Sequence, residues 1–139
     1  MAELEADLRP RLLERMAAFD DAFSQDQASE MGQFFSTDAC LMWPEMEDFV
    51  RRDAIQAAFE ELIGKFTTIA WQPGWTLIKV FGEEAVVIGR FIEDRAPRAI
   101  GAATRVFGRL VEYWSLGADG IWRIDLALTS RYAEEQPLG

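Results

Sequence analysis

The sequence has no histidine and a single cysteine, and these two absences exclude more chemistry than any motif in the chain suggests. Without histidine the chain cannot form a Ser-His-Asp or Cys-His relay, or a histidine-ligated zinc or iron site. Cys40 alone cannot close an intrachain disulfide or build a thiolate metal site, and we expect it to be a buried, inert thiol. Catalysis, if present, should therefore be carboxylate chemistry.

Basic residues are also scarce, because 14 lysines and arginines stand against 24 acidic residues, for a net charge of −10. Residues 1–63 hold 15 acids and five bases, whereas residues 64–139 hold nine of each. Such a chain repels a phosphate backbone, which argues against a nucleic-acid partner. No apolar run approaches the roughly 20 residues of a membrane span, and the acidic start does not resemble a signal peptide. We expect a cytoplasmic protein without a membrane partner.

Nucleotide-binding motifs are missing as well. The chain has neither a P-loop nor a GxGxxG fingerprint, so a nucleotide cofactor is not expected. Glu45, Glu47 and Asp48 cluster in one predicted loop but lack EF-hand spacing, and a solvated loop is the favoured interpretation. We expect neither a cofactor nor a metal.

The 139 residues, half of them apolar, suit a single domain over 1–139. The sequence pattern of the first half of the chain predicts three helices. Pro10 fits the first turn of the first helix, whose apolar residues recur at helical spacing at Leu12, Met16, Phe19 and Phe23. Residues 1–9 would then be an arm or a separate helical turn. Asp26 is a good N-cap for a short second helix, and the third helix is predicted over residues 52–64.

The second half predicts strands over residues 67–81, 84–94, 99–116 and 121–130. The dipeptide Pro73-Gly74 suggests a bulge or bend in the first of these strands. Gly82-Glu83 suits a two-residue hairpin turn, and residues 117–120 a last hairpin loop. Helices followed by strands indicate an α+β fold, in which helices pack on one face of a curved antiparallel sheet. Residues 133–139 are expected to be a tail.

Two local patterns resemble the nuclear-transport-factor-2-like superfamily, which includes ketosteroid isomerase and SnoaL-like proteins. The first is an aromatic–Asp–Ala strand followed by a proline and a helix opening: Phe35-x-x-Asp38-Ala39, Pro44 and Arg52-Asp53-Ala54-Ile55-x-x-x-Phe59. The second follows a strand that ends in Tyr113-Trp114: Gly120-x-Trp122-x-Ile124. The resemblance covers roughly residues 10–132. It implies a cone-shaped sheet with the three helices on its concave face, and a homodimer formed through the sheet's other face.

The same resemblance argues against a ketosteroid isomerase of the usual mechanism. The general base of those enzymes falls on Trp43, and their oxyanion-hole tyrosine falls on Phe19. Their second acid falls at or near Glu112. Phe19, Trp43 and Trp114 are instead expected as walls of a pocket for a small apolar or aromatic molecule. For Trp43, plain core packing is the alternative.

The last hairpin predicts a pair of opposed acids. If residues 117–120 form its loop, Glu112 lies opposite Asp125 and Trp114 opposite Arg123 on one face. Inside a closed pocket the two carboxyls could share a proton and serve as an acid/base pair. The alternative places the acids on the outer face, with Val111, Tyr113, Trp122, Ile124, Leu126 and Leu128 on the buried face.

Trp75 and Arg90 would also face each other across the Gly82-Glu83 hairpin. They could form a cation–π contact or an anion-binding arginine within the pocket, or merely a solvent-facing ladder pair. The leading hypothesis is a SnoaL-like protein that binds a small molecule and moves protons without a cofactor, as an isomerase, dehydratase or cyclase. The rival is a non-catalytic, dimeric ligand-binding or interaction module.

Overall fold

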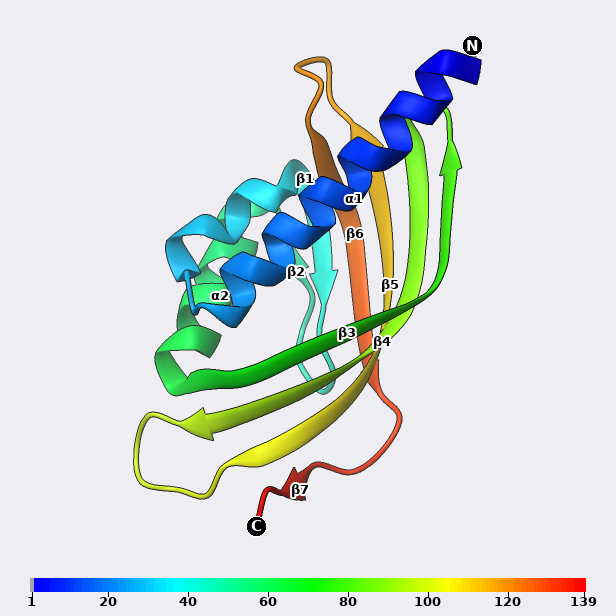
Figure 1. The fold of residues 1–139 in the computed structure, drawn as a ribbon. Helices are drawn as coiled ribbons and strands as arrows, with labels where there is room; N and C mark the ends of the chain where they lie inside the picture. The colour runs from blue at the N-terminus through cyan, green and yellow to red at the C-terminus, as the bar shows by residue number, and fades with distance from the viewer. Residues whose placement is uncertain (1) are drawn as a thin grey trace.

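The computed structural model describes residues 2–139, and side-chain burial from Leu8 onward. The chain begins with α1 (Ala2–Ser24), which is followed by two 3-10 turns, η1 (Ala28–Glu30) and η2 (Gly32–Phe34). The remaining elements are β1 (Phe35–Met42), β2 (Phe49–Val50), α2 (Arg52–Lys65), β3 (Phe66–Phe81), β4 (Glu84–Pro97), β5 (Thr104–Leu116), β6 (Trp122–Arg131) and β7 (Gln136–Pro137). The predicted order of helices followed by strands is confirmed (Figure 1).

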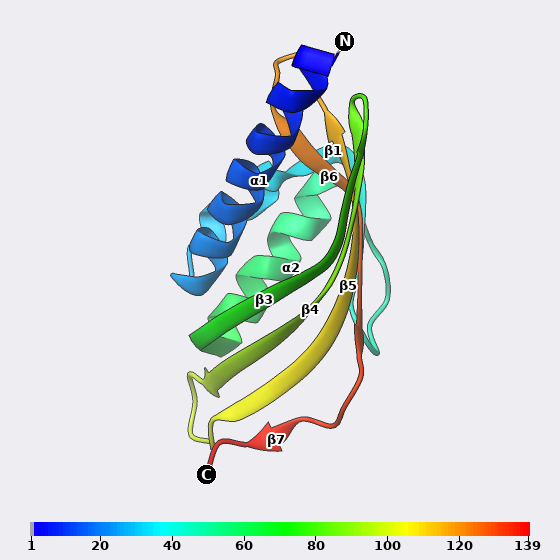
Figure 2. The ribbon, with the colours of Figure 1, turned by 45° about the vertical axis from the view of Figure 1, so that its right-hand side comes forward.

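The strands form one curved sheet in the order β2-β1-β6-β5-β4-β3, with the short β7 added beside β5. Strand β1 runs parallel to β6, whereas the other pairings are antiparallel, so the sheet is mixed rather than wholly antiparallel. Both α-helices lie against the same, concave face (Figure 2). The predicted α+β class, with helices on the concave face of a cone-shaped sheet, is confirmed.

The core lies between the helices and the concave face. Its largest fully buried side chains come from α1, α2 and four strands and include Leu12, Ile55, Phe35, Val87, Trp114 and Trp122. On α1 the buried positions follow one stripe, because Leu8, Leu12 and Met16 are spaced four residues apart. This apolar stripe explains why α1 packs against the concave face of the sheet.

The N-terminal segment differs from the prediction in two respects. Residues 2–9 are not an arm, because α1 begins at Ala2 and continues through Pro10. The burial of Leu8 and Leu12 on either side of Pro10 offsets the hydrogen bond that the proline removes. Asp26 is not a helix N-cap either: it has a positive φ of 56° and accepts hydrogen bonds from the Thr67 hydroxyl (2.8 Å) and the Thr68 N–H (3.1 Å).

The β3–β4 hairpin has the predicted two-residue turn, since Phe81 pairs with Glu84 across Gly82-Glu83. Its register shifts between Trp75 and Leu77, however, so that Trp75 pairs with Gly89 and not with Arg90. Near this register shift β3 and β4 lie close together, and a Cβ on Gly89 would overlap the Gly74 carbonyl oxygen. The irregularity lies near the predicted Pro73-Gly74 bend.

The β5–β6 hairpin has a longer loop than predicted and contains a bulge. Leu116 pairs with Trp122 rather than with Ile121, and the register shifts again between Tyr113 and Trp114. Glu112 therefore lies opposite Ala127. The expected pairs of Glu112 with Asp125 and of Trp114 with Arg123 are wrong, because both the loop and the bulge displace β6 along β5.

In the part of the chain that the structure describes, no helix is long and apolar enough to cross a membrane.

Candidate functional site

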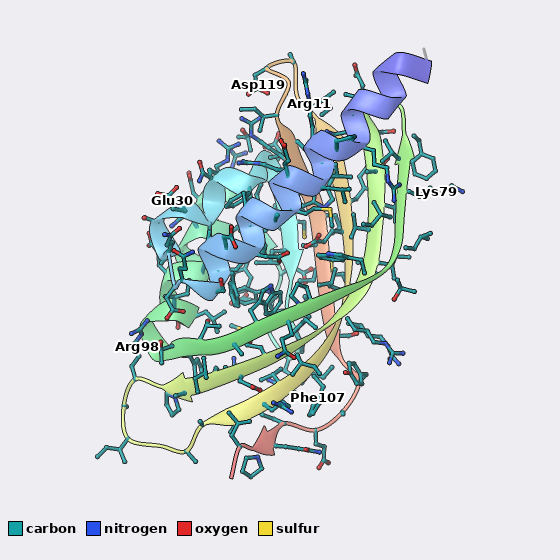
Figure 3. All side chains as sticks on the ribbon, in the orientation of Figure 1. Arg11, Glu30, Lys79, Arg98, Phe107 and Asp119 are labelled. Carbon is teal, nitrogen blue, oxygen red and sulfur yellow. The ribbon has the colours of Figure 1, made fainter. Side chains whose placement is uncertain are left out.

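A cavity of about 290 Å³ opens between α1, α2 and the concave face of the sheet. In Figure 3, side chains occupy the space between the helices and the sheet. The wall is mostly apolar and rich in aromatic side chains, which include Phe19, Phe23, Trp43, Phe59, Trp71 and Phe91. Several of these rings contact one another, for example Trp43 and Phe59 at a centroid distance of 5.1 Å. Such a wall suits a flat, apolar ligand. The volume of the cavity is at the small end of the usual range for ligand pockets.

Glu112 is one of the buried acids of this cavity. It extends from β5 into the wall, is 7% exposed, and accepts a hydrogen bond from the Trp114 indole N–H at 3.1 Å. Burial raises the pKa of Glu112 to about 7, and the negative charge of Asp20 adds to this effect, while the Trp114 hydrogen bond opposes it. Glu112 can therefore both accept and donate a proton near neutral pH.

Asp20 lies beside Glu112 on the opposing helix. Both residues line a smaller cavity of about 10 Å³, next to the larger one, and Glu112 lines the two cavities. The Trp71 indole N–H donates a 2.9 Å hydrogen bond to Asp20. Burial raises the pKa of Asp20 to about 6 despite this bond. The acid pair of this fold is thus formed between α1 and β5, and not within the last hairpin.

A second polar group occupies another part of the wall, on β4. Glu93 is 6% exposed and lines the large cavity together with Arg95. Burial raises the pKa of Glu93 to about 7, although the Arg95 charge lowers it. Lys65 and Arg131 also line this cavity. The cavity therefore combines an aromatic wall with acidic and basic side chains.

The structure brings some of the predicted site residues together and separates others. Phe19, Trp43 and Glu112, three of the predicted site residues, line the large cavity. Trp75 and Trp114 line the small cavity beside it. For Trp43 the two interpretations converge, because the ring packs against Phe49 and Phe59 while it also forms part of the wall.

Arg90 and Asp125 do not reach the cavity. Arg90 is exposed and lies over the Tyr132 ring, with its Cζ 4.9 Å from the ring centroid. Alternation along β4 places it on the convex face, because the neighbouring Phe91 lines the cavity on the concave side. Asp125 lies at the bulge of β6, where it accepts hydrogen bonds from the Ser36 and Ser115 hydroxyls.

The same bulge divides the apolar residues of the last hairpin between two faces. Trp122 and Ile124 are buried beneath the helices, whereas Val111, Leu126 and Leu128 are exposed on the convex face. The expectation that they share one buried face is therefore wrong. Cys40, which pairs with Leu126 across β1 and β6, is half-buried rather than buried.

Asp20, Glu93 and Arg95 were missed by sequence reasoning. A signal for Asp20 was present, because it lies four residues after Met16 and so falls on the apolar stripe of α1. The signal for Glu93 and Arg95 was strand alternation, since Val87, Phe91, Glu93 and Arg95 occupy alternate positions of β4. A buried hydrophobic stripe interrupted by charge is a sequence indication of a polar site.

The fold has many solved counterparts, although no sequence profile of a known family and no curated protein sequence matches the chain. A ketosteroid isomerase-like protein from Erwinia carotovora atroseptica superposes with a TM-score of 0.79 at 16% identity, over 87% of this chain and 93% of that one. A candidate scytalone dehydratase from Novosphingobium aromaticivorans superposes with a TM-score of 0.75 at 17% identity, over 100% of this chain and 98% of that one.

A nuclear-transport-factor-2-like superfamily protein from Salmonella enterica is similar to the same degree, with a TM-score of 0.78 at 18% identity over 94% of each chain. The chain has the α+β fold of the nuclear-transport-factor-2-like superfamily, as the resemblance in its sequence predicted. At these identities the likeness defines the fold, and the site has to be judged by its own residues.

Proposed function

We propose that this protein binds a small aromatic molecule in the large cavity and that Glu112 moves a proton on it. This proposal depends on one observation. The buried carboxyl group of Glu112 lies in a cavity lined by aromatic side chains, beside the second acid, Asp20. In ionised form Glu112 would remove a proton from a carbon next to a carbonyl group, and it would then return that proton to another atom of the same molecule. The net reaction is an isomerisation. It is a dehydration where protonated Glu112 instead gives the proton to a departing hydroxyl group, which leaves as water.

In this proposal Asp20 acts through Glu112 and does not contact the substrate. Burial is the largest cause that raises the pKa of Glu112 to about 7, and the charge of Asp20 adds to it by favouring the protonated form. At such a pKa one group can serve as base and then as acid near neutral pH. The chain needs no histidine for this chemistry. Some solved neighbours carry names of isomerase and dehydratase type, which is compatible with the proposed reaction class.

Binding can be tested with 2-acetylnaphthalene, a flat aromatic ketone. We expect it to quench tryptophan fluorescence, because Trp43 and Trp71 line the cavity. Ala127→Leu adds bulk to the cavity wall and should weaken binding at least tenfold. Val86→Leu alters the half-buried convex position beside Ala85 and Val87 and should leave binding unchanged. Equal binding by all three proteins would contradict the proposed site.

Proton transfer can be tested with the same ketone, by NMR of hydrogen exchange at its methyl group in deuterated water. Glu112→Gln should slow the protein-catalysed exchange by roughly 100-fold or more. Glu47→Gln, at an exposed loop position, is the matched control and should not change the rate. Binding without exchange would favour the rival function, a non-catalytic ligand-binding module.

We also propose that the convex face binds a second copy of the chain. One apolar row crosses five strands of this face through paired positions: Leu77, Ile88, Val111, Leu128 and Met42. Leu128 alone is 43% exposed, and contiguous apolar surface of this kind favours association. Leu128→Glu should convert a dimer to monomers in sedimentation at micromolar concentration, whereas Thr37→Glu should not. A monomeric wild-type protein would contradict the dimer.

A further inference from the structure

Arg95 has an unusual position for a charged side chain. It extends from β4 into the wall of the large cavity, its side chain is only 13% exposed, and its guanidinium lies over the Phe66 ring at 4.0 Å. Its Nε is buried and has no hydrogen-bond partner among the described residues. A buried guanidinium donor without an acceptor is costly, so its position requires an explanation.

A residue of the C-terminal segment, Glu135, holds the guanidinium of Arg95 in place. Glu135 accepts hydrogen bonds from Arg95 (3.3 Å), Arg131 (3.0 Å) and the Thr104 hydroxyl (2.5 Å). Glu135 does not itself line the cavity, whereas Arg95 and Arg131 do. The carboxylate therefore orients Arg95 and leaves part of the guanidinium available toward the cavity.

Other charged groups also line the cavity. Lys65, at the end of α2, also lines it, but Lys65 is paired with Glu61 at 2.9 Å. Glu93, two residues before Arg95 on β4, is a buried acid of the same cavity, and its burial favours the neutral form. A protonated Glu93 would add a second donor and would not repel an anion.

The position of this group relative to Glu112 suggests an elongated ligand. Arg95 pairs with Thr104 on β5, and Glu112 lies eight residues further along the same strand. That separation is roughly 26 Å measured along the strand, and the curvature of β5 shortens the direct distance between its two ends (Figure 1). A ligand could therefore present one end to Arg95 and another to Glu112.

We infer that Arg95 forms an anion-binding subsite and that the natural ligand is an extended aromatic molecule with a carboxylate at one end. This inference rests on the proposed function, because it uses the same cavity. The ligand carboxylate would accept hydrogen bonds from the part of the Arg95 guanidinium that lines the cavity, the aromatic body would pack against Phe66, Phe91 and Trp71, and the far end would reach Glu112.

Three probes with the same ring system separate this inference from the proposed function: 2-naphthoate, 2-naphthamide and 2-acetylnaphthalene. We expect the wild-type protein to bind 2-naphthoate about tenfold more tightly than the two neutral probes, as a charge-assisted hydrogen bond would give. Arg95→Gln should remove this preference and leave the affinity for the neutral probes within about twofold. Arg95→Lys keeps the charge and should keep part of the preference.

Arg90→Gln, on the convex face, is the matched control and should change no affinity. The comparison of the three probes on the wild-type protein does not depend on any variant. It therefore tests the anion preference even if the Arg95→Gln protein folds poorly. Neutral and anionic probes that bind equally would overturn the subsite and leave the proposed function standing. A preference that survives Arg95→Gln would overturn the assignment to Arg95. If none of the three probes binds, both proposals fail.

Discussion

The indole N–H of Trp114 donates to the carboxyl group of Glu112, two positions earlier on the same face of β5, at a distance of 3.1 Å. The pair is buried, with Trp114 1% and Glu112 7% exposed. The hydrogen bond favours the ionised carboxylate, but burial and the charge of Asp20 favour the protonated acid and outweigh it. The balance leaves a buried acid that titrates near neutral pH.

Glu112→Gln should stabilise the protein at neutral and alkaline pH. The pKa of Glu112 rises from 4.5 to about 7 on folding, so the native state binds this proton more tightly than the unfolded state. The contribution of Glu112 to the free energy of unfolding is therefore fully present below pH 4.5. It is lost as the pH rises to about 7 and does not return at higher pH. The glutamine variant lacks this loss, and at about pH 8 it should be more stable by up to roughly 3 kcal/mol.

Denaturant unfolding at about pH 5 and about pH 8 would measure this effect. Glu47→Gln replaces an exposed glutamate and should follow the wild-type pH dependence. If Glu112→Gln also does so, the carboxyl group is hydrated in solution and the proposed acid/base role loses its basis.

Asp20→Asn should lower the pKa of Glu112, because it removes the negative charge that favours the protonated form. Selective 13C labelling of glutamate carboxyl groups would follow this titration by NMR. The neighbouring Asp21→Asn is the natural control, since Asp21 is exposed and contributes to the pKa of Asp20 rather than to that of Glu112. An unchanged titration in Asp20→Asn would show that the two acids are not coupled.

Gly89→Ala should destabilise the β3–β4 hairpin. The added Cβ would overlap the Gly74 carbonyl oxygen on the facing strand, and backbone atoms cannot move away as a flexible side chain can. We expect a loss of roughly 2–4 kcal/mol on thermal unfolding, comparable to other overpacked sites. Gly64→Ala on α2 meets nothing within 4 Å and should instead stabilise the helix by roughly 0.5–1 kcal/mol. A neutral Gly89→Ala would mean that the strands lie farther apart.

Asp125→Ala should cost roughly 1–2 kcal/mol, because it leaves the Ser36 and Ser115 hydroxyls without their acceptor at the bulge of β6. The control is Asp38→Ala, which removes an exposed ion pair with Arg51 and should cost under about 1 kcal/mol. Denaturant unfolding distinguishes the two. Equal effects would indicate that Asp125 is hydrated and that the bulge does not depend on it.

Local features of the sequence predicted most of the elements. The two-residue turn at Gly82-Glu83 set the start of the β3–β4 ladder correctly, because the turn length determines the pairing of the residues that flank it. The same reasoning failed after one irregularity, since a single extra residue near Trp75 moved Arg90 out of register. In the last hairpin, the loop length and a bulge together separated Glu112 from Asp125.

The sequence by itself determined which chemistry is absent, the α+β order of elements, and the aromatic residues from which a pocket could form. It also contained the acid at Glu112, though not its partner. Only the tertiary structure decided that Glu112 lies beside Asp20, because that contact depends on how α1 packs across β5, and packing geometry is not encoded in any local pattern. The burial that raises the pKa values of Asp20, Glu93 and Glu112 arises in the same way.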